Sequence, residues 1–500
     1  MMNSKGSLFL DLLPTELLVG ILERLPYEDL LSCKAVCRRL YTLVKECTSL
    51  QYTAQLAITG MEDNPRNTLS KSDKLIRLKD YRRIWDNLAA EDATFYKQHV
   101  PIRDGPAWEL TGGVLSQNVG SRAIEFKQLP SRLRGIEEKT WKVEFGFDIR
   151  DFTADPGQDL LVVVQAMRKK ECRVRFLSMS TGQRHREARH ETVSFERRTI
   201  SRPSTHEIRV NGPYVGVLVK EIHTAAGWCH LSVWDWRTAE EVYSVTHRYW
   251  SFCFFQDCFL LLAEFTPPEV QSQGSLVVVD LANTDAPPRR LDLLPCLAGA
   301  TSIYNMELLC EPGSRWAPPS GQNPPFHVSR EDRLIVLLVH VTDDRLAEDY
   351  ALTFSMLASK LASYVDKSSA EKVNIPWCDW GTDTCRATES AFFWEGIWPC
   401  CVYGTKHVVQ EDNHVVIYDF NPHAIREQLL PGPSPNGNVE VVTLRSQLEE
   451  QLFEGDIITT LPFRKIKTNL AISEIDSVML SEDTIVIVED EREKFRIASL

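Results

Sequence analysis

The chain has 500 residues, of which 43% are hydrophobic and 25% are charged, and this composition is typical of a folded protein with two or more domains. No stretch approaches the roughly 18 uninterrupted apolar residues that a membrane helix needs, so we expect an intracellular protein without a signal peptide, located in the cytoplasm, the nucleus or both. The net charge is -13, and residues 1–110 contain equal numbers of basic and acidic side chains, so the acidic excess lies after residue 110. Neither nucleic acid nor a membrane is therefore expected as a partner.

The first 50 residues have the pattern of three helices. Pro14 suits a first helical turn, and an apolar stripe with helical spacing follows it as far as Leu25. Pro26 is expected to stop this helix, a short second helix is predicted from about Glu28 to Cys33, and a third is predicted from about Lys34. Three helices of this size cannot cover so many apolar side chains by themselves.

A further helix is predicted from residue 70 to residue 88, with Ser70 or Ser72 as its cap. Its apolar face consists of Leu75, Leu78, Ile84, Trp85 and Leu88. Six of its side chains are basic and three are acidic, which permits either an anion contact or a solvated basic face on a helix that braces two domains. We favour the bracing helix.

After about residue 110 the pattern changes to short apolar or alternating runs, which predict β-strands. Ten such runs begin at Asp159, Arg173, Tyr214, His230, Phe259, Ser275, Arg333, Tyr350, His414 and Thr484. Many are paired and recur at intervals of roughly 45 to 75 residues, which favours a large all-β domain built as a β-propeller of about seven blades. A pair of β-sandwiches is the alternative.

The 13 cysteines are scattered and are never spaced as CxxC, so neither a disulfide framework nor a zinc ribbon is predicted. The nearest approach to a metal-binding set is Cys378, Cys385, Cys400 and Cys401 with His407 and His414. Because these spacings match no zinc finger or knuckle, we predict no metal and no other cofactor.

The N-terminal pattern resembles the F-box, a three-helix module of roughly 45 residues. The matching residues, in the family's order and with its gaps, are Leu13, Pro14, Glu16, Leu17, Leu18, Ile21, Leu22, Leu25, Asp29, Leu30, Leu31, Val36 and Cys37. The chain departs from the family at Leu40, where a tryptophan is most common, and this removes an aromatic anchor. The remaining chain resembles, less specifically, a fungal F-box group with a basic, tryptophan-bearing helix and a repetitive all-β region, on the evidence of "DFTADPGQDLLVVV" and "RFLSMSTG".

The resemblance implies that the first helices bind an adaptor of the Skp type, which is attached to a cullin scaffold. The residues expected to bind the adaptor are Leu13, Pro14, Leu17, Leu18, Ile21, Leu22, Leu25, Leu30, Leu31, Val36, Cys37 and Leu40. The expected domains are an F-box at 1–50, a helical linker at 51–110 and a propeller-like substrate-binding domain at 111–500. Periodicity alone also permits another arrangement, in which the three helices fold back as a cap on the β-domain.

These features predict a non-catalytic substrate receptor of an SCF-type ubiquitin ligase, which binds the adaptor and an unknown target protein. An F-box protein with a scaffold role and a propeller hydrolase are the alternatives. The chain contains no GxSxG, HExxH, GxxxxGK[ST] or GxGxxG motif in support of the hydrolase.

One basic segment is a candidate target-binding site. Residues 182–209 contain seven arginines and three histidines against four glutamates, within a domain that is acidic overall. Arginine binds phosphate and carboxylate groups in a bidentate manner, so Arg184, Arg186, Arg197 and Arg198 are candidates to hold an acidic or phosphorylated target. The alternative is a solvated loop whose arginines pair with neighbouring glutamates.

Overall fold

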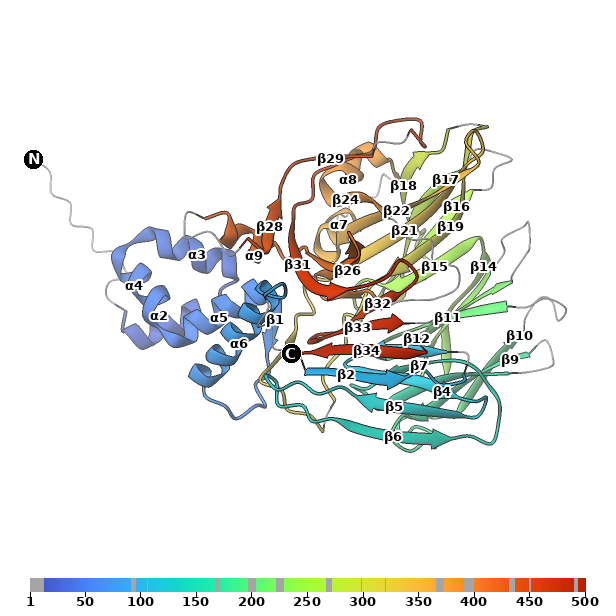
Figure 1. The fold of residues 1–500 in the computed structure, drawn as a ribbon, viewed down its shortest axis with the longest axis horizontal. Helices are drawn as coiled ribbons and strands as arrows, with labels where there is room; N and C mark the ends of the chain where they lie inside the picture. Colours follow the sequence, from blue (N-terminus) through green and yellow to red (C-terminus); the bar gives the residue numbers. More distant parts are fainter. Residues whose placement is uncertain are drawn as a thin grey trace, which may run out of the picture.

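The computed structural model describes residues 13–90, 96–105, 107–166, 171–196, 204–221, 229–266, 272–297, 299–319, 321–365, 373–390, 400–430, 437–448, 451–489 and 493–500. A helical region precedes a large ring of β-sheets, and the two lie side by side (Figure 1). The helical region contains α2 (Thr15–Leu22), α3 (Tyr27–Val36), α4 (Arg38–Glu46), α5 (Thr48–Thr59), the short strand β1 (Met61–Asp63) and α6 (Lys71–Asp86).

The boundary between the second and third helices differs from the prediction. Helix α3 continues through Lys34 to Val36, and α4 begins at Arg38. Only Cys37 separates them, with an extended backbone at φ -155° and ψ 163°. No glycine or proline accompanies this corner, so the sequence carries no turn signal there.

Helix α6 is confirmed, with Ser70 as its cap. The Ser70 hydroxyl oxygen accepts a hydrogen bond from the Asp73 backbone N–H at 3.1 Å, and the hydroxyl donates to the Asp73 carboxylate at 2.6 Å. On α6, Leu75, Leu78 and Trp85 of the predicted apolar face are buried, and Ile84 packs against the same core. The helix ends at Asp86, so Leu88 is buried in this core from the turn that follows.

Seven sheets form the blades of a propeller, and each contains four antiparallel strands. The sheets of blades 4 and 6 each have a fifth short strand, β23 (Asn374–Ile375) and β28 (Val439–Val442). Blade 1 consists of β3 (Trp108–Thr111), β4 (Val114–Val119), β5 (Ala123–Gln128) and β6 (Lys139–Glu144). Blade 2 consists of β7 (Ile149–Asp155), β8 (Leu160–Gln165), β9 (Glu171–Ser178) and β10 (Thr192–Glu196). Blade 3 consists of β11 (Ser204–Asn211), β12 (Tyr214–Glu221), β13 (Cys229–Asp235) and β14 (Glu240–His247). Blade 4 contains β15 (Tyr249–Phe254), β16 (Phe259–Thr266), β17 (Gln273–Asp280) and β18 (Arg289–Pro295). Blade 5 consists of β19 (Thr301–Leu309), β21 (Leu334–Asp343), β22 (Glu348–Leu357) and β24 (Cys385–Ser390).

Blades 6 and 7 complete the ring. Blade 6 is β25 (Val402–Tyr403), β26 (Lys406–Glu411), β27 (His414–Asp419) and β31 (Phe463–Ala471), and blade 7 is β32 (Ser477–Leu480), β33 (Thr484–Glu489), β34 (Lys494–Ser499) and β2 (Tyr96–Pro101). Strand β2 pairs with β34, so the two ends of the β-region close one sheet (Figure 1). The strands of the propeller therefore begin at Tyr96, inside the segment expected to be a helical linker.

The all-β prediction is confirmed, and the arrangement is the propeller and not the paired sandwiches. Each of the ten predicted runs overlaps a strand. The sequence patterns did not predict three helices of the β-region, which are α7 (Ala358–Val365), α8 (Trp377–Thr384) and α9 (Pro422–Gln428). They also did not predict the short strands β20 (Phe326–Val328), β23 (Asn374–Ile375), β28 (Val439–Val442), β29 (Ser446–Gln447) and β30 (Ile458–Thr459).

Strand β8 shows why the central strands are apolar on both faces. Leu160, Val162 and Val164 belong to a core cluster that includes strands of blade 3, whereas Leu161 and Val163 belong to a cluster shared with blade 1. Successive side chains of a strand point to opposite faces, so each face of the blade packs against a different neighbour. This arrangement produces continuous apolar runs instead of alternating ones.

Candidate functional site

The residues predicted to bind an adaptor divide into three groups by burial. Pro14, Leu17, Ile21 and Val36 are exposed; Leu13, Leu25, Leu31 and Cys37 are half-buried; and Leu18, Leu22, Leu30 and Leu40 are buried. The exposed fractions of Leu17, Ile21 and Val36 are 57%, 48% and 58%. Because these side chains are large and apolar, their exposure marks a candidate interaction surface.

The buried group forms the interior of the helical region. Leu22, Leu30 and Leu40 pack together with Val44 and Leu50. A side chain in this interior supports a partner only indirectly, by holding the helices in place. Leu40, at the position where the family most often has tryptophan, is one of these interior residues. Adaptor binding by any of the twelve residues stays a prediction.

The propeller contacts a different side of the helical region. Helices α5 and α6 and strand β1 lie against it (Figure 1), and Tyr27 and Leu31 of α3 pack in one cluster with Ala424 of α9. Helices α2 and α4 lie on the side away from it (Figure 1). Tyr52 of α5 and Tyr81 of α6 belong to the same apolar cluster as Phe326 and Val402 of the β-region. The exposed residues Leu17 and Ile21 of α2 therefore do not serve as a cap on the propeller.

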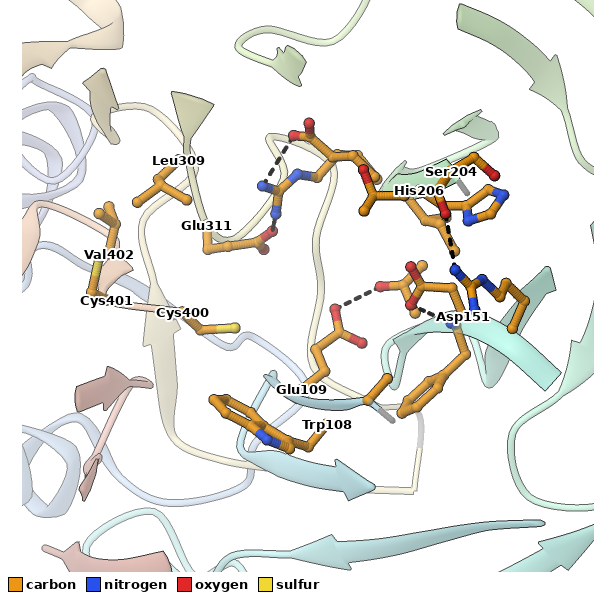
Figure 2. Close-up of a pocket in the computed structure, with 18 residues that line it drawn as sticks. Trp108, Glu109, Asp151, Ser204, His206, Leu309, Glu311, Cys400, Cys401 and Val402 are labelled. Atoms are coloured by element: carbon orange, nitrogen blue, oxygen red, sulfur yellow. Dashed lines mark hydrogen bonds and ion pairs between the residues drawn. The ribbon is translucent and has the colours of Figure 1, made fainter. Parts of the chain in front are cut away.

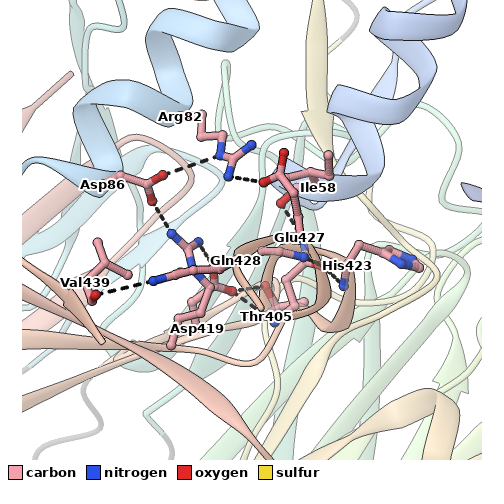
Figure 3. Close-up of polar contacts among 12 residues, drawn as sticks. Ile58, Arg82, Asp86, Thr405, Asp419, His423, Glu427, Gln428 and Val439 are labelled. Atoms are coloured by element: carbon pink, nitrogen blue, oxygen red, sulfur yellow. Dashed lines mark hydrogen bonds and ion pairs between the residues drawn. The ribbon is translucent and has the colours of Figure 1, made fainter. Parts of the chain in front are cut away.

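Partly buried charged contacts join α6 to the propeller (Figure 3). Arg82 pairs with Glu427 of α9, and Asp86 pairs with Arg464 of β31. The guanidinium Nη1 of Arg464 also lies 3.1 Å from Oδ2 of Asp419. Burial opposes the charge on Asp419, but Lys406 and Arg464 outweigh it and hold the pKa of this carboxyl below its ordinary value.

The other basic residues of α6 also have partners within the chain. Lys74 donates to Asp63 at 2.7 Å, Lys71 donates to Glu23 at 2.9 Å, and Arg77 donates to the Leu133 carbonyl at 3.0 Å. Asn421 adds two further links to α5, because its side-chain amide donates to the carbonyls of Ala57 and Ile58 at 2.9 and 3.0 Å. These contacts support the bracing role of α6.

A cavity of about 340 Å³ is lined mainly by the innermost strands β3, β7, β11 and β19 and by residues 400–402, and we name it the channel cavity. Glu109, Asp151 and Glu311 lie around this space (Figure 2). Burial raises the pKa of Glu109 to about 7, although this carboxylate accepts hydrogen bonds from the Thr153 hydroxyl at 2.6 Å and the Ala154 N–H at 3.1 Å. Burial also raises the pKa of Asp151 to about 7.

Three other charged side chains of the channel cavity form ion pairs with one another. Arg209 lies between two carboxylates, with Nη2 at 3.3 Å from Glu207 and Nη1 at 3.4 Å from Glu311. Burial raises the pKa of the Cys400 thiol far above its ordinary value, so this cysteine is not an activated nucleophile. These contacts have a structural role, because Arg209 joins β11 of blade 3 to the end of β19 in blade 5.

The arginines proposed for target binding lie only partly within the described residues. Arg184 and Arg186 are exposed between β9 and β10: Arg184 donates to the Arg189 carbonyl at 3.3 Å, and Arg186 lies 3.9 Å from Glu187. Arg197 and Arg198 lie outside the described residues. Target binding by these four residues stays a prediction.

Among the described residues, the cysteines and histidines considered as metal ligands do not gather around one point. Cys378 is exposed on α8, and Cys385 is buried on β24. Within the ranges that the structure describes, no three histidine, cysteine, aspartate or glutamate side chains are placed to hold one metal ion. Over the same ranges, no helix has both the length and the apolar character to span a bilayer.

A family model described as F-box-like matches residues 10–52. Similarities to solved structures are weak. A protein of Listeria monocytogenes, lmo1340, has a TM-score of 0.28 at 10% identity over 65% of this chain and 94% of its own. The WD40 domain of SCAP from fission yeast has a TM-score of 0.29 at 10% identity, covering 79% of this chain and 81% of that domain.

An oligogalacturonate lyase in complex with manganese has a TM-score of 0.33 at 9% identity, covering 81% of this chain and 96% of the lyase. Since all three TM-scores are below 0.5, these likenesses carry no argument about function. A search of curated proteins finds no match. The family match and the blades together establish the architecture: the chain has an F-box-like domain at residues 10–52, followed by a seven-bladed β-propeller.

Proposed function

We propose that this protein is a substrate receptor of an SCF-type ubiquitin ligase. In this proposal the F-box-like domain binds a Skp-type adaptor, and the propeller holds a target protein. The observation that carries the proposal is the exposure of Pro14, Leu17, Ile21 and Val36 on an F-box-like domain whose other side is docked to the propeller. Exposed apolar side chains of this kind are typical anchors of a protein interface.

The receptor needs no chemistry of its own. The adaptor connects it to a cullin, and the target bound to the propeller is then held near a ubiquitin-charged enzyme. Such tethering converts a dilute bimolecular attack into an effectively intramolecular one. The contacts of Arg82 and Asp86 with the propeller support this function, because they fix the orientation of the two binding surfaces relative to each other.

The test replaces Leu17 and Ile21 together by alanine in the full chain and measures its affinity for a Skp-type adaptor by calorimetry. Truncation of a buried interface anchor costs about 2 kcal/mol or more, so we expect the affinity to fall at least about 100-fold. The matched control replaces Leu346 and Leu444, two exposed leucines of the propeller, and should bind normally.

Undiminished binding by the Leu17 and Ile21 variant would contradict the proposal. A second measurement separates a degradative role from a scaffold role that uses the same adaptor. If the role is degradative, cullin copurifies with the adaptor, and ubiquitin is found on proteins bound to the wild-type chain but not on those bound to the variant.

A further inference from the structure

A second and larger cavity, of about 980 Å³, lies between blades 5 and 6, and we name it the interblade groove. Its blade 5 wall contains Glu307, Leu338, Thr353 and Thr388, which are register partners across β19, β21, β22 and β24. Because neighbouring strands are about 4.8 Å apart, this row is about 14 Å long, the length of roughly four extended residues. The groove thus has room for a short peptide segment.

The described residues that line the groove are strongly acidic. They include six carboxylates and neither lysine nor arginine. Glu411 is already neutralised, because it pairs with Lys465 and accepts a hydrogen bond from the Tyr418 hydroxyl. Glu307 interacts electrostatically with Lys220 and Arg209, and Glu389 lies on the opposite face of β24 from Thr388. The other three, Asp412, Glu474 and Asp476, have no ion pair with any described residue. This concentration of uncompensated negative charge attracts a cation.

Two buried polar atoms supply a second, independent observation. His407 is only 5% exposed, lines the groove, and its Nδ1 makes no hydrogen bond within the described chain. Burial lowers the pKa of His407 to about 4, so the ring is neutral at physiological pH and does not offset the carboxylates. Oε1 of Gln410 is also buried without a hydrogen-bond partner. A neutral imidazole and an amide oxygen both accept hydrogen bonds, whereas lysine and arginine only donate them.

Other ligand classes fit this groove less well. A nucleic acid or a phosphorylated peptide would be repelled by the carboxylates. A single divalent ion would need several ligands around one point, and the described residues provide no such group. The length of the groove, its charge and its acceptors all favour a chain that carries several donors.

We propose that the interblade groove binds an extended segment of a partner protein that contains lysine or arginine side chains. This inference deepens the proposed function and rests on it in one respect, since it takes the bound segment to be part of the target. In this assignment Asp412 and Glu474 pair with the basic side chains, while His407 and Gln410 accept hydrogen bonds from the segment.

The test uses the full chain and two fluorescein-labelled hexapeptides, one with three arginines and one with three glutamates at the same positions. Fluorescence anisotropy should show binding of the arginine peptide only, with an affinity that falls at least ten-fold between 50 and 500 mM salt, as expected for charge pairing. The double variant Asp412→Asn and Glu474→Gln should weaken this binding at least ten-fold. Both side chains are exposed and have no ion pair with a described residue, so folding should be preserved.

Matched controls separate the groove from the general acidity of the protein. The variant Glu240→Gln and Glu440→Gln, which removes two exposed carboxylates of other sheets or edges, should leave binding unchanged. The charge-reversal variant Glu474→Lys should abolish binding of the arginine peptide. The proposal is overturned if the arginine peptide does not bind, or if the control pair and the groove pair weaken binding equally.

The same variants also separate this inference from the proposed function. Adaptor affinity is measured on the chain with both groove substitutions, and it should equal that of the wild type, because the groove lies in the propeller. A chain that binds the arginine peptide but no adaptor would overturn the proposed function and keep the groove. A chain that binds adaptor but no arginine peptide would overturn the groove alone.

Discussion

The F-box-like domain and the propeller differ in what covers their apolar side chains. In the propeller, each blade is covered on both faces by its neighbours, so a strand such as β8 is buried along its length. In the F-box-like domain the same helix contains buried Leu18 and Leu22 beside exposed Leu17 and Ile21. The difference indicates that the propeller completes its own core, whereas the small helical domain has apolar surface to offer to another protein.

Charged side chains are enclosed mainly in the propeller and not in the F-box-like domain. The helices present their charges to solvent or to partners at the junction with the propeller, such as Arg82 with Glu427. The propeller encloses carboxylates in two cavities, and in the interblade groove three of them have no basic partner among the described residues. One region therefore offers an apolar surface and the other an acidic groove, and two such surfaces suit two partners of different chemistry.

Replacing Arg464 by methionine should have the largest effect, because it breaks the junction that holds these two regions in one arrangement. The change leaves Asp86 and Asp419 without their shared cation in a buried setting. Removing one partner of a buried ion pair typically costs about 3 to 5 kcal/mol. We expect this loss in the free energy of unfolding, measured with denaturant, together with faster hydrogen exchange in α6 and α9.

The matched control for this prediction is Arg426→Met. Arg426 joins the same two regions through Glu28 at 4.0 Å, but both side chains are more than half exposed. An exposed pair contributes at most about 1 kcal/mol. Equal losses for the two variants would show that burial of the Arg464 network does not matter to the junction.

Replacing Leu30 by alanine should have the next largest effect and is confined to the helical domain. Leu30 is fully buried in its small core, and truncation of a buried leucine costs about 2 to 5 kcal/mol. We expect hydrogen exchange to accelerate in α2, α3 and α4 and to stay unchanged in the central strands of the blades. The matched variant Leu17→Ala should change stability by no more than about 0.5 kcal/mol, since Leu17 is exposed. Destabilisation of the same size by Leu17→Ala would mean that this side chain packs within the protein and is not free for an adaptor.

The fold could be predicted from the sequence where side chains are buried on both faces of a strand, and less well where they are exposed. Central strands such as β8 and β17 are apolar on both faces, and their sequences contain runs that indicate strands directly. Outer strands are polar and half-exposed, as in β14, and gave no comparable signal. The short helices α7, α8 and α9 lie between strands and are too short to establish a helical period.

The candidate sites were predictable only where their residues are close in the sequence. The twelve adaptor-binding candidates follow one local pattern, but the division into exposed Leu17 and buried Leu18 depends on how three helices pack. The junction brings Asp86 together with Arg464, and the interblade groove brings Glu307 together with His407. Residues separated by 100 positions or more carry no local signal of such contacts, so only the folded chain reveals them.

The smallest of the expected effects concerns the channel cavity and the pH dependence of stability. Burial raises the pKa of Glu109 to about 7, above the ordinary value of 4.5. Between these two pH values the folded state holds a proton that the unfolded state has lost, so the contribution of Glu109 to stability is present below pH 4.5 and is lost as the pH rises towards 7. One such group adds a slope of at most about -1.4 kcal/mol per pH unit. Solvent in the cavity reduces this slope, because part of the Glu109 side chain remains exposed.

The variant Glu109→Gln removes this single proton and should therefore make the free energy of unfolding less dependent on pH. Its difference from the wild type should change steadily between pH 4.5 and 7, in the direction that favours the variant at higher pH, and should be constant above that range. Asp151 and Glu311 still titrate in the variant, because burial raises the pKa of each, so the slope should diminish without vanishing. Denaturant unfolding at four pH values, with exposed Glu240→Gln as the control, measures this change. A difference that is the same at every pH would show that Glu109 ionises alike in the folded and unfolded chains, and that the channel carboxyls are no more shielded from solvent than those on the surface.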